Sequence, residues 1–120
     1  MGFFKKVAKE MIIGMTDDVF NMTSERYDNV EDTIIAMFQS KPLNKELPFK
    51  RLRKNDINFI ANSLSLLSKE QAKRALLQLT IQALESDNLS AMTDPINVLE
   101  IARKCQQDED PLFIGQQRNK

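Results

Sequence analysis

The chain has 120 residues, 42% of them apolar, and its 17 basic and 17 acidic residues give a net charge of zero. It contains no histidine and no tryptophan, and Cys105 is its single cysteine. These counts exclude histidine-dependent catalysis, internal disulfides and the common zinc sites. No apolar run approaches the roughly 20 residues of a membrane span, so we expect a cytoplasmic protein rather than a membrane protein.

The turn-forming residues indicate the fold class. Three glycines and four prolines are too few for a chain of short strands, which would need turn residues at every reversal. We therefore predict an all-α fold, a compact bundle of four to five helices. The bundle forms a single helical domain over residues 1–107, and residues 108–120 form a C-terminal tail.

The first predicted helix begins near Phe3 and ends near Gly14, a residue typical of helix C-termini. Its polar half carries most of the lysines, and its other half is apolar: Phe3, Phe4, Val7, Ala8, Met11, Ile12 and Met15. Three interpretations remain open for this amphipathic helix. The apolar half packs into the core, binds a protein partner, or lies on an anionic membrane.

Residues 16–41 contain neither glycine nor proline, which predicts one long helix over about residues 17–39. Apolar and aromatic residues follow a three–four spacing along it: Phe20, Thr23, Tyr27, Val30, Ile34 and Met37. This seam is a candidate dimer interface. The alternative is a break at Asp28, where residues 28–31 resemble a capping box with Asp28 as the N-cap.

Residues 40–54, SKPLNKELPFKRLRK, are predicted to form a basic connecting loop. The segment contains two prolines, one glutamate and six basic residues: Lys41, Lys45, Lys50, Arg51, Arg53 and Lys54. Three roles are open for it: a solvated loop, a contact for an acidic protein, or a contact for nucleic-acid phosphates.

Two helices are predicted after this loop. The first begins near Asn55 and has an apolar face that continues to Leu67. Ser68 and Gln71 form a capping box that starts the second, which ends near Glu85. This second helix is apolar on two sides, which is typical of the central helix of a bundle.

Asp94 and Pro95 predict the start of the last helix, with Asp94 as N-cap and Pro95 at the first position. The helix is expected to end near Gln106 and to bury Cys105. Beyond it, three acidic residues precede Leu112 and Phe113. This tail either folds back onto the bundle or docks on a partner.

The sequence predicts binding rather than catalysis. Its adjacent carboxylates, such as Asp17 and Asp18, point in different directions on a helix and therefore do not form an acid–base pair. We expect no enzyme activity, no cofactor and no metal site. The preferred hypothesis is a small protein-binding factor, such as an adaptor, an inhibitor or an immunity-type protein, that acts through a helix face. The candidate contacts are Phe3, Phe4, Lys50, Arg51, Arg53, Lys54, Leu112 and Phe113.

Two alternative hypotheses belong to other classes. Residues 41–54 and the helix after them would bind nucleic acid, in which case binding would weaken steeply with salt. Otherwise the chain would be a homodimeric structural element held together by the seam between Phe20 and Met37.

Overall fold

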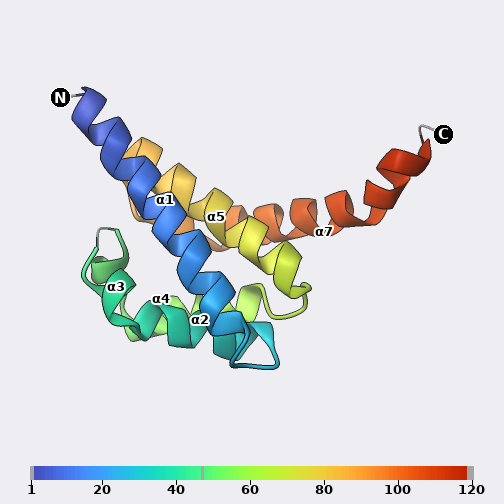
Figure 1. Ribbon diagram of the computed structural model, residues 1–120, viewed down its shortest axis with the longest axis horizontal. Helices are drawn as coiled ribbons and strands as arrows, with labels where there is room; N and C mark the ends of the chain where they lie inside the picture. Colours follow the sequence, from blue (N-terminus) through green and yellow to red (C-terminus); the bar gives the residue numbers. More distant parts are fainter. Residues whose placement is uncertain (1, 47, 119–120) are drawn as a thin grey trace.

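The chain is described here from a computed structural model. The structure describes the backbone of residues 2–46 and 48–118, and the side-chain surroundings of residues 8–46 and 48–107. The fold is all-α, as predicted (Figure 1). The described residues form seven α-helices and one 3-10 helix: α1 (Gly2–Ser24), α2 (Val30–Gln39), α3 (Lys41–Asn44), η1 (Phe49–Arg51), α4 (Lys54–Ser63), α5 (Lys69–Ser86), α6 (Ser90–Thr93) and α7 (Pro95–Arg118). The number exceeds four to five because α3 and α6 are single turns, too short to give a periodic signal.

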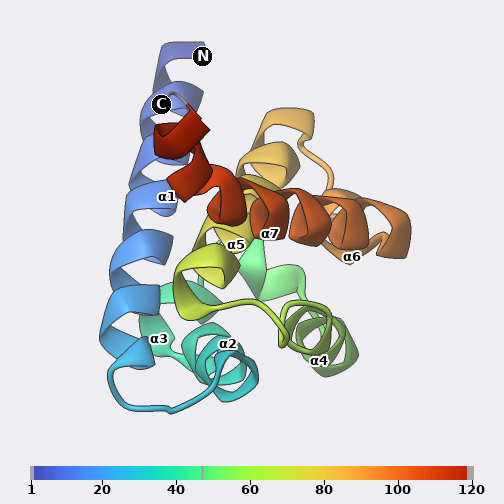
Figure 2. The ribbon, with the colours of Figure 1, turned by 90° about the vertical axis from the view of Figure 1, so that its right-hand side faces the viewer.

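Helix α5 lies at the centre of the bundle, and α1 and α7 run antiparallel to it. The Lys69 ammonium at the start of α5 donates to the Ser24 carbonyl at the end of α1. The Asn97 amide in the first turns of α7 donates to Gln82 near the end of α5. Helices α2, α3 and α4 lie below α5 and α7, at the level of the C-terminal part of α1 (Figures 1 and 2).

The two-sided apolar pattern of α5 correctly predicted its central position. One face is buried in the core: Ala72, Ala75, Leu76, Leu79 and Ala83. The other apolar residues, Leu77, Ile81 and Leu84, are half-buried. The predicted capping box is also present, since the Gln71 N–H donates to Ser68 Oγ at 3.1 Å and the Ser68 N–H donates to Gln71 Oε1 at 2.9 Å.

The predicted end of the first helix at Gly14 is wrong, because α1 continues to Ser24. A glycine ends a helix by adopting positive φ, and no described glycine does so. The predicted apolar half is correct in part: Ile12 and Met15 pack against the core, whereas Met11 is 62% exposed. The side chains of Phe3 and Phe4 lie outside the described residues.

The single helix over residues 17–39 is also wrong, because the chain breaks between Ser24 and Val30. The alternative of a break here is confirmed, but the N-cap of α2 is Asn29 and not Asp28. Asn29 Oδ1 accepts from the Asp32 N–H at 2.7 Å. The break itself is stabilised from a distant part of the chain, since the Lys69 ammonium donates to the carbonyls of Ser24 and Tyr27, each at 2.6 Å.

The proposed dimer seam does not exist as a continuous surface. The break places Tyr27 in the turn, where it is exposed. The other large apolar members of the seam, Phe20, Val30, Ile34 and Met37, are buried in the core of the same chain. These side chains therefore stabilise the bundle and are not available for pairing with a second copy.

Helix α7 begins at Pro95, as predicted, and continues past Gln106 to Arg118. Cys105 is buried, as expected, whereas Leu99 of the same helix is 54% exposed. The side-chain surroundings of residues 108–120, which include Leu112 and Phe113, lie outside the described residues, so the two expected roles of the tail stay predictions.

Candidate functional site

The described residues of the predicted basic loop, 41–46 and 48–54, contain more helix than the sequence predicted. They contain α3 and η1, and α4 begins at their end. Three apolar side chains anchor the segment: Leu43 is fully buried, Phe49 is 3% exposed and Leu52 is 9% exposed. Phe49 also packs against Phe38 of α2, with ring centroids 5.3 Å apart.

The backbone of this segment is held by a series of hydrogen bonds. The Lys50 N–H donates to the Glu46 carbonyl at 2.8 Å, and the Leu52 N–H donates to the Phe49 carbonyl at 3.0 Å. At the start of α4, the Arg53 N–H donates to Asp56 Oδ2 at 2.9 Å. These bonds fix the direction in which the basic side chains leave the surface.

The six basic side chains of this segment form what we call the basic surface. All six are exposed: Lys41, Lys45, Lys50, Arg51, Arg53 and Lys54. Within the described residues, no carboxylate forms a salt bridge with any of them. The three anchors are buried, whereas the six basic side chains face solvent. Four of the predicted contact residues, Lys50, Arg51, Arg53 and Lys54, are therefore exposed on one anchored segment.

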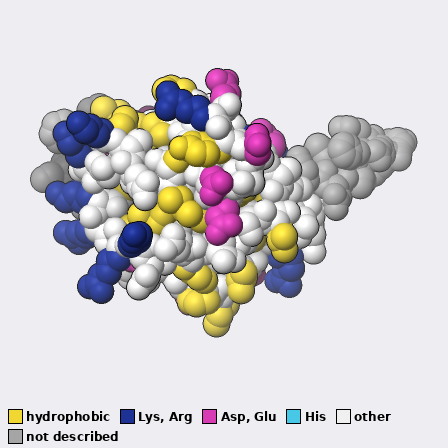
Figure 3. Space-filling view, turned by 90° about the horizontal axis from the view of Figure 1, so that it is seen from below, with side chains coloured by type: hydrophobic (Ala, Val, Ile, Leu, Met, Phe, Trp, Pro, Cys, Tyr) yellow, Lys and Arg dark blue, Asp and Glu magenta, His cyan; other side chains and the backbone are white. Residues whose placement is uncertain are grey.

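The two ends of α2 differ in their balance of charge. Four exposed carboxylates and one exposed cation, Arg26, lie in the turn before α2 and in its first turn; the carboxylates are Glu25, Asp28, Glu31 and Asp32. The basic surface begins directly after the other end of this helix, which is about 15 Å long for its ten residues. Figure 3 shows Lys and Arg side chains mainly toward the side where α3 lies, and Asp and Glu side chains as a separate group nearer the middle.

A hollow of about 220 Å³ borders the basic surface. We call it the anchor hollow. One wall comes from Pro48 and Arg51, and the other comes from the end of α5 and the turn after it, which includes Leu84, Asp87 and Leu89. The turn is formed by Asp87, which takes a left-handed conformation (φ 56°, ψ 37°) as the C-cap of α5. Sequence patterns could not predict this hollow, because its walls are about 35 residues apart in the chain.

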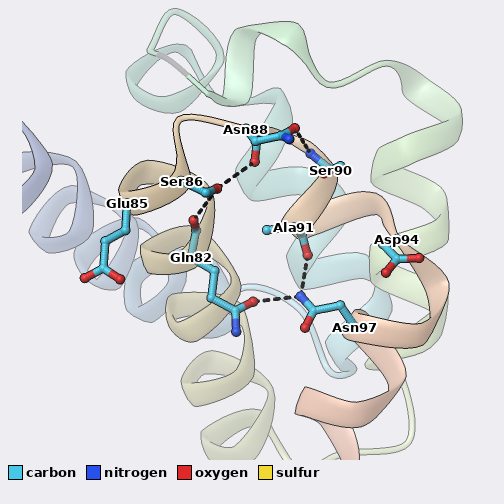
Figure 4. A pocket seen from close by; sticks show the side chains of 8 residues that line it. All are labelled: Gln82, Glu85, Ser86, Asn88, Ser90, Ala91, Asp94 and Asn97. Carbon is cyan, nitrogen blue, oxygen red and sulfur yellow. Dashed lines mark hydrogen bonds between the residues drawn. The ribbon is translucent and has the colours of Figure 1, made fainter.

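A second hollow, of about 610 Å³, lies between the end of α5, α6 and the start of α7 (Figure 4). Its amides bind one another: Asn97 Nδ2 donates to Gln82 Oε1 at 2.7 Å and to the Ala91 carbonyl at 2.8 Å. Glu85 and Asp94 lie on either side of this network (Figure 4). The two carboxylates are therefore not brought together. The hydrogen bonds of Asn97 instead link α7 to α5 and α6.

The described residues contain no group of three or more histidine, cysteine, aspartate or glutamate side chains that could hold a metal ion. None of the helices in the described part is both long enough and apolar enough to cross a membrane. Comparison of the chain with protein-family models, with curated proteins and with solved structures finds no match.

Proposed function

We propose that this chain is a cytoplasmic, non-catalytic protein-binding factor, of the adaptor, inhibitor or immunity type, whose partner presents an acidic surface. The observation that carries the proposal is the basic surface, six exposed cations on a segment anchored by three buried side chains. Such a surface attracts an acidic partner from a distance and selects against basic ones. Because the described backbone of the segment is held by hydrogen bonds, less conformational entropy is lost on binding than for a free loop.

The charge separation along α2 favours a protein partner over nucleic acid. A nucleic acid is an extended polyanion, with about one charge per 1.7 Å of duplex. If it lay along α2, it would also meet the carboxylates of Asp28, Glu31 and Asp32 at the other end of this helix. A folded protein can present acidic groups to the basic surface and avoid or match those carboxylates.

The proposal is tested with a charge reversal and a matched control. The test variant carries Lys50→Glu and Arg53→Glu, and the control carries Arg103→Glu and Lys104→Glu on the exposed part of α7. Both variants change the net charge equally. A protein captured from cell extract is identified and purified, and its affinity for the three chains is then measured by calorimetry.

We expect the test variant to lose at least about tenfold in affinity, because two attractive contacts become repulsive. The control should stay within about twofold of the original chain. Equal losses in the two variants would refute the role of the basic surface. Retention of nucleic acid alone, with binding that weakens steeply as salt rises, would favour the nucleic-acid alternative.

A further inference from the structure

The anchor hollow is large enough for one side chain, and its lining mixes apolar residues with the polar residues Arg51, Asp87 and Asn88. Its volume is about 220 Å³. A protein cavity of about 150 Å³ accepts benzene, so one aromatic or branched aliphatic side chain fits here. Pro48, Leu84 and Leu89 supply apolar walls, and both leucines are half-buried, so a side chain in the hollow would cover apolar surface that now faces water.

The charges around the hollow are distributed unevenly. Arg51 lines the wall formed by η1, and Lys50 and Arg53 are exposed on the same segment. Asp87 lines the opposite wall, at the C-terminal end of α5, where the helix dipole is also negative. A carboxylate is therefore favoured on the η1 side and disfavoured on the α5 side.

We propose that the anchor hollow receives a single bulky apolar side chain of the partner, and that acidic residues next to this side chain in the partner lie over Lys50, Arg51 and Arg53. This inference rests on the proposed function and specifies the partner: a protein segment with an aromatic or aliphatic anchor beside carboxylates. Binding sites of this kind gain most of their affinity from one buried anchor, while the surrounding charges set the rate and specificity of association.

Three synthetic peptides test the proposal on the full chain. The first has a central phenylalanine flanked on each side by aspartate and glutamate. The second replaces the phenylalanine with alanine, and the third keeps the phenylalanine but has lysine flanks. Titrations of the ¹⁵N-labelled protein report both the affinity and the amides that shift.

We expect the acidic phenylalanine peptide to bind at least about tenfold more tightly than the other two, because only it combines the anchor with the carboxylates. The amides of Arg51, Leu84 and Leu89 should shift most. Equal binding of the acidic phenylalanine and alanine peptides would overturn the anchor and leave the basic surface standing. If the lysine-flanked peptide bound as tightly as the acidic phenylalanine peptide, the acidic specificity would be overturned. If neither of the two acidic peptides bound, both proposals would be overturned.

Two matched variants separate the roles further. Leu84→Gln makes one wall of the hollow polar, and Leu77→Gln makes the same change at another half-buried position of α5 that does not line the hollow. Glutamine keeps the helix propensity of leucine, and circular dichroism checks that both variants fold. Leu84→Gln should lower the affinity for the acidic phenylalanine peptide by about tenfold and leave the affinity for the acidic alanine peptide unchanged. Leu77→Gln should change neither affinity by more than about twofold. The double variant Lys50→Glu with Arg53→Glu should bind both acidic peptides more weakly. Any other pattern contradicts the proposed roles of the hollow and of the basic surface.

Discussion

Lys69 is the first residue of α5, but its side chain caps the C-terminal end of α1. Its removal should destabilise the protein measurably. The side chain is half-buried, and its ammonium donates to the Ser24 carbonyl at the end of α1 and to the Tyr27 carbonyl in the turn that follows, each at 2.6 Å. Hydrogen bonds that involve a charged group contribute about 1.5–3 kcal/mol, and partial exposure places these two near the lower limit. They also satisfy carbonyls that have no partner within α1.

An opposing effect reduces this contribution. Lys69 is the first residue of α5, where a cation is unfavourable by about 0.3–1 kcal/mol because the helix N-terminus is itself positive. Water can also replace the ammonium at the exposed Tyr27 carbonyl. We therefore expect Lys69→Met, which keeps most of the aliphatic stem, to lower the free energy of unfolding by about 1–2 kcal/mol.

Urea denaturation followed by circular dichroism measures this change. With a slope of about 1.5 kcal/mol per molar urea, the midpoint should fall by about 1 M. Lys73→Met is the matched control one turn later. Lys73 forms a partly exposed salt bridge with Asp17 at 3.1 Å and donates to Asn21 Oδ1 at 3.1 Å, and exposed charge pairs of this kind are worth about 0–1 kcal/mol. A midpoint for Lys69→Met that is no lower than that of Lys73→Met would refute the capping argument.

Two further predictions concern local helix signals. Gly14→Ala should raise the free energy of unfolding by about 0.5–1 kcal/mol, because a Cβ there would meet no atom within 4 Å and alanine is the better helix former. A thermal melt measures this change, and a lower melting temperature would instead indicate a helix end at Gly14. Asn29→Ala should cost about 1 kcal/mol in urea denaturation, because it removes the N-cap of α2. Asp28→Ala should be close to neutral in the same assay, and the opposite ranking of the two variants would place the cap at Asp28.

The charge arrangement of α2 is also favourable for the helix itself. Glu31 and Asp32 lie in its first turn, and the basic surface follows its C-terminal end. Both charges complement the helix dipole. The arrangement that we propose for partner recognition therefore carries no cost to the stability of α2.

The sequence alone determined the features whose causes are local. The all-α class follows from the helical spacing of apolar residues and the scarcity of turn residues. The start of α5 follows from Ser68 and Gln71, and the start of α7 follows from Pro95, because a cap acts within about one helical turn. The six cations of the basic surface were also visible as a group in the sequence.

Only the tertiary structure decided the features that depend on distant contacts. The break after α1 is stabilised by Lys69, about 40 residues further along the chain. Met11 and Leu99 fit an apolar periodicity yet are exposed, because the neighbouring helices cover a different arc of each helix. The anchor hollow exists only because Phe49 and Leu52 are buried and hold η1 beside the end of α5. Periodicity gives the type of a helix, whereas the packing of the neighbouring helices fixes where it bends, which residues it exposes and which hollows lie beside it.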